Sequence, residues 1–381
     1  MKPALRSVAS QPSWIIQSRD IELAVTRLGG HMAPVTFRRR SRRPISPYYV
    51  SPWQSEGLKI DEPVLVPLRG DFFCLPFGGG EYRGEKHPAH GETAGRTWRL
   101  AGCEQTAGVT TLTLTLRTRA RAGKVTKHLR LADGHDAVYV SHTLEGFSGR
   151  MPLGHHATLA VPEKPGDMRI AVSPFRFGQT APGQFGDPAA GEYTSLASGR
   201  RFRDLRKVPL IWARPRYGDC SRLPTREGFT DLLAVFARRD VKRAWTTATV
   251  VSQRYLWFSL KDPRVLPTTA MWISNRGRHG PPWNGRNRCV GLEDVCAYFD
   301  RGLAESVRAN PLSKSGIPTA VELSPDKPTP VNYIEGAVPV PGGFDRVADV
   351  QFADDEVRFI AESGKSATAT VKHDFLDTGE V

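Results

Sequence analysis

The chain has 381 residues, of which 39% are hydrophobic and 24% charged, with a formal net charge of +14. This composition excludes wholesale disorder. No stretch approaches the roughly 18 consecutive apolar residues of a membrane-spanning helix, and the N-terminal residues lack the apolar segment of a signal peptide. We therefore expect a cytoplasmic protein with no membrane partner.

The basic surplus is compatible with nucleic-acid binding, with an acidic ligand or with a solvated basic surface. Residues 38–43 (RRRSRR) form the one dense basic run, and they lie between a strand-like segment and a proline-rich one. A nucleic-acid-binding protein concentrates its charge on one element of a recognisable motif. We therefore interpret residues 38–43 as a solvated loop and expect no nucleic-acid partner.

Alternation of apolar and polar residues with a period of two dominates the chain. It predicts a strand over 21–26 and then a meander of three antiparallel strands over 109–117, 125–131 and 137–144, with turns between them. Further strands are predicted over 232–237, 246–253 and 255–260, and alternating apolar positions recur over 350–370. A turn of helix is expected near 303–307, and residues 354–362 fit either helix or strand.

These features indicate an all-β protein built as a large antiparallel β-sandwich. The 36 Gly and 30 Pro are scattered, as expected for many short strands joined by turns. We find no internal repeat and no break in composition, so the sequence predicts a single domain over 1–381. Residues 163–227 are irregular and rich in Gly, Pro and Arg, and we expect them to form a long loop region over one face of the sandwich.

The sequence offers little support for a metal or another cofactor. The five cysteines are odd in number and include no C-x-x-C pair, so neither a disulfide scaffold nor a structural zinc site is expected. The run Gly78-Gly79-Gly80 lacks the Lys-Ser/Thr of a phosphate-binding P-loop. His87, His90 and Glu92 have a spacing that could bring three metal ligands together, but no helix presents them and no fourth ligand is near. We expect no cofactor and no metal.

Three segments place rare polar residues inside β-like sequence. The first runs from Arg69-Gly70 to His90-Gly91 and Trp98, the second is residues 154–159 (GHHATL), and the third is residues 290–296 (VGLEDVC). Any one of them alone is as well explained by a turn cap or a solvent-facing residue. Their order along the chain is more informative.

Taken together, the segments resemble the aldose 1-epimerase (galactose mutarotase) superfamily. The resemblance spans residues 14–306, and residues 307–381 are expected to form a β-rich extension packed on the domain. It implies the galactose mutarotase-like supersandwich fold. The matching motifs are Gly29-Gly30, Arg69-Gly70, His90-Gly91 ahead of Trp98, His156 in GHHATL, and Glu293 in Gly291-Leu292-Glu293.

The resemblance implies that Glu293 is the base that takes the proton from the C1 hydroxyl of an aldose. The acid that protonates the ring oxygen is then His156, with His155 as the other possible counterpart, and we expect the acid and the base on opposite sides of the sugar ring. The predicted substrate-binding residues are Arg69, His90, His155, Asp231, Trp272 and Trp283, with Phe72 and Phe73 as further stacking candidates.

The leading hypothesis is therefore a mutarotase-type carbohydrate isomerase that acts on a monosaccharide or an acidic sugar derivative. A non-catalytic carbohydrate-binding protein of the same fold is the main alternative, and sugar-acid lyase chemistry and nucleic-acid binding follow. The oligomeric state is left open. The decisive observation is whether Arg69, His90, His156 and Glu293 converge on one pocket.

Overall fold

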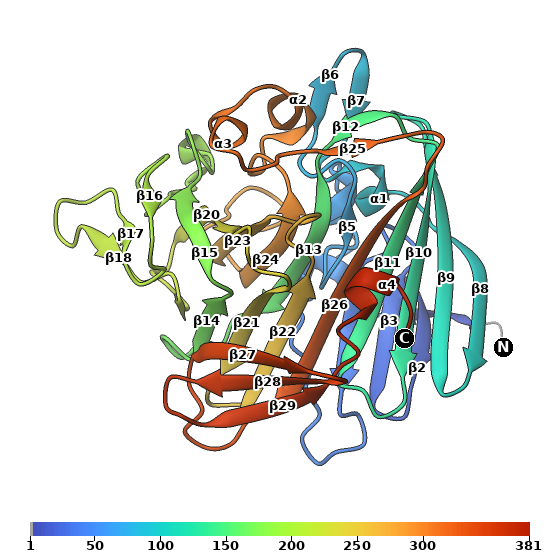
Figure 1. Cartoon of the computed structure of the whole chain (residues 1–381). Coiled ribbons are helices and arrows are strands. Elements are labelled where there is room, and N and C mark those ends of the chain that lie inside the picture. Colours follow the sequence, from blue (N-terminus) through green and yellow to red (C-terminus); the bar gives the residue numbers. More distant parts are fainter. Residues whose placement is uncertain (1–2) are drawn as a thin grey trace.

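Two large sheets, both wholly antiparallel, face each other in the computed structural model, which describes residues 3–381 (Figure 1). The first sheet has nine strands in the order β19 (Arg222–Leu223), β14 (Met168–Val172), β21 (Ala244–Val250), β22 (Tyr255–Lys261), β26 (Thr329–Pro339), β11 (Ala137–Glu145), β10 (Gly123–Ala132), β9 (Val109–Thr118) and β8 (Arg99–Thr106). The second has seven strands in the order β16 (Arg201–Phe202), β15 (Phe175–Thr180), β20 (Phe229–Ala237), β23 (Thr268–Asn275), β24 (Arg288–Cys296), β13 (Leu153–Ala160) and β5 (Phe73–Cys74).

The Leu/Thr alternation of β9 explains how the nine-stranded sheet faces the core. Leu112 and Leu114 are buried, whereas the threonines at 111, 113 and 115 are less so, and Leu112 pairs with Leu129 across β9 and β10. The predicted three-strand meander is confirmed as β9–β10–β11, because each strand pairs with the next in register. The other predicted strands are also confirmed, within a few residues at their ends, as β3, β20, β21 and β22.

The inner faces of the two large sheets form the main hydrophobic core. The strands of the seven-stranded sheet are buried on both faces; in β23 and in all but the first residue of β24 every side chain is buried. Because successive residues of a strand point to opposite faces, one set of these side chains faces the sandwich core. The other set faces outward and is covered by loops.

Smaller elements surround the sandwich. A four-stranded sheet, β1 (Leu5–Val8), β2 (Gln11–Gln17), β3 (Ile21–Thr26) and β4 (Met32–Phe37), precedes it in the chain. The remaining short elements are β6 (Gly80–Tyr82), β7 (Glu85–His87), β12 (Gly149–Met151), β25 (Val321–Leu323), β17 (Val208–Pro209), β18 (Tyr217–Gly218), α1 (Gly91–Gly95), α2 (Gly302–Val307), α3 (Pro311–Lys314) and the 3-10 turns Pro52–Ser55, Pro63–Leu65 and Pro188–Ala190. The turn of helix predicted near 303–307 is confirmed as α2.

The last 75 residues divide into two parts. Strand β26 lies in the middle of the nine-stranded sheet, between β22 and β11. Strands β27 (Val347–Ala353), β28 (Glu356–Ala361) and β29 (Ser366–Thr370) instead pack on the outer face of that sheet, where Phe359 meets Phe258 with ring centroids 5.0 Å apart. Residues 354–362, which fit either helix or strand in the sequence, contain strand β28. The C-terminal segment therefore both completes the sandwich and covers it.

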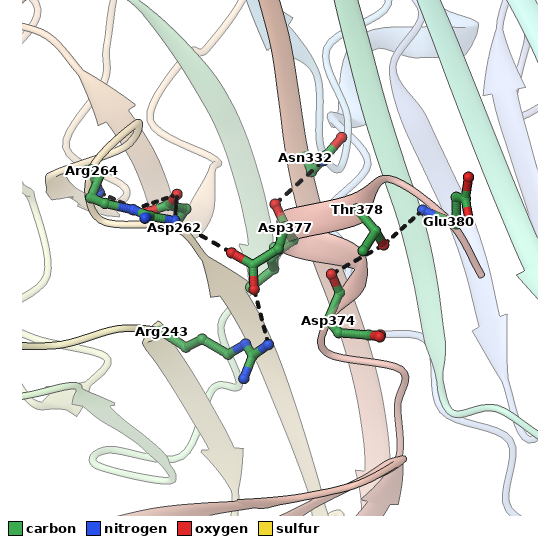
Figure 2. Close-up of polar contacts among 9 residues, drawn as sticks. Arg243, Asp262, Arg264, Asn332, Asp374, Asp377, Thr378 and Glu380 are labelled. Atoms are coloured by element: carbon green, nitrogen blue, oxygen red, sulfur yellow. Dashed lines mark hydrogen bonds and ion pairs between the residues drawn. The ribbon is translucent and has the colours of Figure 1, made fainter.

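Polar contacts hold the short helix α4 (Phe375–Thr378) against β26 and the loop after β22 (Figure 2). Asp377 accepts from Arg243 at 3.2 Å and from Arg264 at 3.3 Å, and the Asn332 amide donates to the carbonyl of Leu376 at 3.3 Å. These contacts attach the C-terminal end of the chain to the sheet.

Two predicted loop regions have different outcomes. Residues 38–43 form turns in which all but Arg39 are exposed, as expected for a solvated loop. Residues 163–227 are less irregular than expected, because they supply β14 and β15 to the two large sheets before continuing into the short elements β16 to β19. No helix among residues 3–381 is long and apolar enough to cross a membrane.

Candidate functional site

An imidazole and a carboxyl group meet on the outer face of the seven-stranded sheet. Strands β13 and β24 pair so that His156 lies directly opposite Glu293, and directly opposed residues of an antiparallel pair project to the same side. The Nε2 atom of His156 and the Oε1 atom of Glu293 are 3.1 Å apart. The two groups thus stand side by side on one wall, which corrects the expectation that they flank a sugar ring from opposite sides.

A cavity of about 250 Å³ lies alongside this pair. Its polar lining includes His90, His156, Glu293 and Asp300, and Trp272 and Trp283 supply much of its apolar wall. Six residues singled out in the sequence therefore line one pocket: Phe72, His90, His156, Trp272, Trp283 and Glu293. This convergence is the central observation of the site.

Burial drives both members of the pair towards their neutral forms. Burial, reinforced by the negative charges of Asp300 and Asp294, raises the pKa of Glu293 well above its usual value. Burial, with the nearby His90 and His31 as lesser causes, lowers the pKa of His156 well below its usual value. A neutral carboxyl and a neutral imidazole in contact share one proton, which can sit on Oε1 or on Nε2.

Aromatic stacking fixes the orientation of the His156 ring. The ring of Phe72 stacks on it at a centroid distance of 4.5 Å and also stacks on His31 at 4.2 Å. The backbone N–H of His156 donates to the carbonyl of Phe72, and its Nδ1 atom lies 3.2 Å from the Thr158 hydroxyl. With Nδ1 occupied by Thr158, Nε2 is left for Glu293 and for the cavity.

His90 lies edge-on to His156, with ring centroids 5.0 Å apart. Its backbone is left-handed (φ 58°), and the following Gly91 approaches the Leu75 carbonyl so closely that a Cβ atom there would lie 2.0 Å from the oxygen. Burial lowers the pKa of His90 to about 4, so its ring is neutral at physiological pH. Position 91 therefore requires glycine, and this tight turn holds the His90 imidazole at the cavity.

Two tryptophans form an apolar part of the cavity wall. Trp272 on β23 and Trp283 meet at a centroid distance of 5.5 Å in an edge-to-face arrangement, and Trp53 packs on the far side of Trp283 at 4.8 Å. The indole N–H of Trp272 donates to the Thr230 hydroxyl at 3.0 Å. Flat apolar faces of this kind suit the C–H face of a sugar ring.

No protein-family model matches the sequence, and no curated protein matches it. Solved structures do match. A galactose mutarotase-like protein from Clostridium acetobutylicum superposes with a TM-score of 0.59 at 10% identity, covering 88% of this chain and 97% of that one. A galactose mutarotase related enzyme from Lactobacillus acidophilus gives 0.52 at 11% identity, covering 86% and 97%. A galactose mutarotase-like protein from Lactobacillus casei gives 0.52 at 13% identity, covering 86% and 100%.

The fold is the galactose mutarotase-like sandwich. At identities this low the likeness establishes the fold alone. The roles of individual residues in the cavity are therefore argued below from their geometry.

Arg69 is part of this sandwich but not of the cavity. Its guanidinium is buried and donates to the backbone carbonyls of Pro67, Val8 and Ala9 and to the side-chain oxygen of Gln54. The contacts with Val8 and Ala9 join the N-terminal strands to the segment before β5, those with Pro67 and Gln54 lie within that segment, and Arg69 does not line the pocket. The sequence assigned Arg69 to the substrate, whereas the structure uses it to fasten the N-terminal strands.

His155 and Asp231 also point elsewhere. His155 faces the sandwich interior, opposite to His156, where its Nδ1 atom lies 2.9 Å from Asp71 and its ring stacks on Tyr333. Asp231 accepts from the backbone N–H groups of Ser195 and Leu196 and from the Ser195 hydroxyl, and it lines a separate hollow. Of the two adjacent histidines, only His156 reaches the cavity.

The predicted alternative of metal ligation does not fit the side chains. His87 contacts Glu85 at 2.9 Å, Glu92 pairs with Arg96 and accepts from the backbone of residues 119 and 120, and His90 faces the cavity. Across residues 3–381, no group of three His, Cys, Asp or Glu side chains is placed to hold a metal ion.

Three polar lining residues were missed by the sequence reasoning: Glu62, Arg278 and Asp300. Arg278 pairs with the buried Glu192 at 2.9 Å and lies over the ring of Phe185. Asp300 follows β24 by four residues, and its position after the Glu293 strand was the one available signal. Arg278 lies in the arginine-rich segment 276–288, where no sequence pattern distinguishes it.

Proposed function

We propose that the cavity binds a monosaccharide and that the His156–Glu293 pair interconverts its anomers. The observation that carries this proposal is the direct contact between imidazole and carboxyl beside a cavity of about 250 Å³. Opening a hemiacetal ring requires one proton to leave the C1 hydroxyl and one to reach the ring oxygen. Both oxygens are bonded to C1, so an acid and a base standing side by side can serve them together.

The His156–Glu293 pair regains its starting protonation state after one reaction cycle. In its ionised form, the Glu293 carboxylate takes the proton of the C1 hydroxyl while the His156 imidazolium gives one to the ring oxygen. The C1–ring-oxygen bond breaks and a C1 aldehyde forms, which leaves Glu293 protonated and His156 neutral. After rotation about C1–C2, His156 takes back the proton of the ring hydroxyl and Glu293 returns one to the aldehyde oxygen. The pair ends as it began.

Burial favours the neutral pair, and transfer of the shared proton from Glu293 to Nε2 of His156 across their 3.1 Å contact forms the ionised pair with no change in net charge. Because burial raises the pKa of Glu293 and lowers that of His156, the proton is not locked on the imidazole. In this proposal His90, which lies edge-on to His156, contacts a sugar hydroxyl, and the faces of Trp272 and Trp283 stack on the ring.

Size and charge favour a neutral monosaccharide over an acidic derivative. A cavity of about 250 Å³ lies below the usual range for drug-sized ligands, roughly 300–1,000 Å³. Its one lining arginine, Arg278, is already paired with Glu192, and its other charged groups are carboxyls. A carboxylate or phosphate on the sugar would therefore find no unpaired cation in the lining of this cavity.

Anomer exchange measured by NMR on a panel of aldoses tests the proposal. Glu293→Gln and His156→Gln are expected to lower the acceleration about 100-fold or more, since positioned acid–base groups contribute this much. Glu163→Gln provides the matched control, because the Glu163 side chain is 88% exposed. Calorimetry should show that the sugar still binds to the Glu293 variant.

Two outcomes would count against this function. If Glu293→Gln retains the acceleration, the pair does not carry the chemistry. If the unmodified protein binds a sugar but accelerates no anomer exchange, the non-catalytic carbohydrate-binding alternative is favoured. A cytoplasmic location stays a prediction.

A further inference from the structure

Residues 200–226, here called the basic lobe, carry half of the chain's net charge. They contain nine Lys or Arg and two Asp, a surplus of seven against +14 for the whole chain. The lobe includes β16 to β19, and the loop between β17 and β18 extends beyond the two large sheets at the left of Figure 1. The sequence already showed that residues 163–227 are rich in Arg, although the shorter run at 38–43 is denser.

The cations of the basic lobe are almost all without an acidic partner. Within the described part of the chain, Arg206 is the one member that forms an ion pair, with Asp204 and Glu362. Arg214 and Arg216, in the β17–β18 loop, are exposed and form none. Elsewhere many arginines are paired, for example Arg278 with Glu192 and Arg286 with Glu56. A group of unpaired like charges creates a positive surface potential that attracts acidic ligands and surfaces.

Apolar side chains are exposed at the same place. Five large hydrophobic side chains are exposed among residues 3–381, and three of them, Tyr193, Ile211 and Tyr217, lie in or next to the basic lobe. Ile211 and Tyr217 belong to the β17–β18 segment and are 55% and 53% exposed. They flank Arg214 and Arg216, so the outermost loop combines an aliphatic chain, an aromatic ring and two cations.

A hollow at the base of the lobe adds a place for a phosphate group. It measures about 500 Å³ and is lined by Arg176, Arg201 and Arg203. Arg176 and Arg201 are oriented by hydrogen bonds to the carbonyl and hydroxyl of Ser315, and Arg201 lies over the ring of Phe177. Three arginines with no acid in the lining make this hollow electrostatically favourable for a phosphate group.

We propose that the basic lobe docks on an anionic membrane surface, with the β17–β18 loop entering the headgroup region. Arginines attract acidic phospholipid headgroups, and tyrosine and aliphatic side chains partition into the interface beneath them. Exposed Ile211 favours this occupant over nucleic acid or an acidic glycan, because an isoleucine neither stacks on bases or sugars nor binds phosphate. The interaction needs no spanning helix, and it is independent of the sugar chemistry proposed above.

Vesicle sedimentation tests the proposal with the full-length protein. The protein should bind vesicles of phosphatidylcholine with phosphatidylglycerol, should not bind phosphatidylcholine alone, and should dissociate as salt is raised. Arg214→Glu combined with Arg216→Glu should weaken partitioning on the order of thirtyfold or more, at about one kcal/mol per basic residue removed. Ile211→Ser combined with Tyr217→Ser should weaken it roughly tenfold at unchanged charge.

The matched control is Arg40→Glu combined with Arg42→Glu, which alters net charge equally at exposed positions in the other basic run. It should bind vesicles nearly as the unmodified protein does, and thermal melts should show all variants folded. No binding to phosphatidylglycerol vesicles, or an equal loss in the control, overturns the proposal. Binding to poly(U) RNA that the Ile211/Tyr217 variant retains, without vesicle binding, would assign the lobe to nucleic acid instead.

Discussion

The two faces of one strand pair show how the carboxyl group that we propose to be catalytic differs from a structural one. Glu293 and Asp294 are consecutive on β24, and His156 and His155 are consecutive on β13. Glu293 projects outward beside a cavity, whereas Asp294 projects into the sandwich and is completely enclosed. Both carboxyl groups are buried, so burial alone does not decide what either of them does.

The difference lies in their partners. Burial alone would raise the pKa of Asp294, but the ammonium of Lys261 and the hydroxyls of Thr269 and Ser259 hold it below its usual value. The hydroxyl of Tyr333 adds a further donor at 2.9 Å. Glu293 has one close ionisable partner, His156, which is itself driven towards neutrality. A carboxylate whose oxygens accept hydrogen bonds from several donors stays ionised. A carboxyl group that shares a proton with an imidazole beside a cavity can exchange that proton.

The largest effect is expected from Asp294→Asn. This change leaves the buried ammonium of Lys261 without its counter-charge, and breaking a buried pair costs about 3–5 kcal/mol. Denaturant unfolding should show this loss at neutral pH, and the loss should shrink in acid. The reason is that a depressed pKa contributes stability above the usual aspartate value of about 4, and that contribution is lost as pH falls through the folded value. An unchanged free energy of unfolding at pH 7 would contradict this assignment.

A smaller loss is expected from Thr269→Val, which keeps the shape of the side chain but removes the hydroxyl. The hydroxyl donates to Asp294 at 2.6 Å and also lies 2.7 Å from the Lys261 Nζ atom. Hydrogen bonds to charged groups contribute about 1.5–3 kcal/mol. Combining Thr269→Val with Asp294→Asn should give less than the sum of the single losses, since the two residues share one network.

Glu293→Gln should raise the free energy of unfolding at neutral and alkaline pH, in contrast to the two losses above. A carboxyl group whose folded pKa is raised stays protonated while the unfolded chain ionises, so stability falls as pH rises above about 4.3. Glutamine removes this penalty. Relative to the unmodified protein, the variant should be more stable at pH 8 than at pH 4, as thermal melts across that range would record. A pH-independent difference would mean that Glu293 ionises alike in both states.

The smallest effect is expected at the surface pair between Asp377 and its two arginines (Figure 2). Arg264 is 72% exposed and Arg243 14%, but the Asp377 carboxylate that they share is itself 37% exposed, and exposed ion pairs contribute about 0–1 kcal/mol. Asp377→Asn should therefore lower the free energy of unfolding by less than about 1 kcal/mol, and added salt should reduce the difference. A loss as large as that of Asp294→Asn would show that α4 supports more of the sheet than its contacts indicate.

The strands were predictable because period-two alternation is a local property. The run 109–117 places its leucines inside and its threonines on the other face, as β9 does. The segment 354–362 was ambiguous because the choice between helix and strand depends on β27 and β29, which pair on either side of it. Local pattern thus specifies the strands, and long-range pairing resolves the ambiguous ones.

The candidate site was predictable only in part. His156 and Glu293 were found because family-like motifs surround them, and the register of β13 and β24 accounts for their contact. Their catalytic roles stay predictions. The position of Arg69 depends on the carbonyls of residues 8 and 9, some 60 positions away, and that of Asp231 depends on Ser195. Distant backbone partners leave no trace in the local sequence.

The central place of β26 has a consequence for how the protein is made. Its neighbours β11 and β22 end at residues 145 and 261. The edge of each strand that faces β26 stays unpaired until residues 329–339 have been made. A growing or truncated chain that stops before this strand has two open β edges in the middle of its largest sheet, where unintended pairing and aggregation begin. The nine-stranded sheet is therefore completed only after residues 329–339 have been made, and fragments that stop before residue 329 are poor candidates for independent expression.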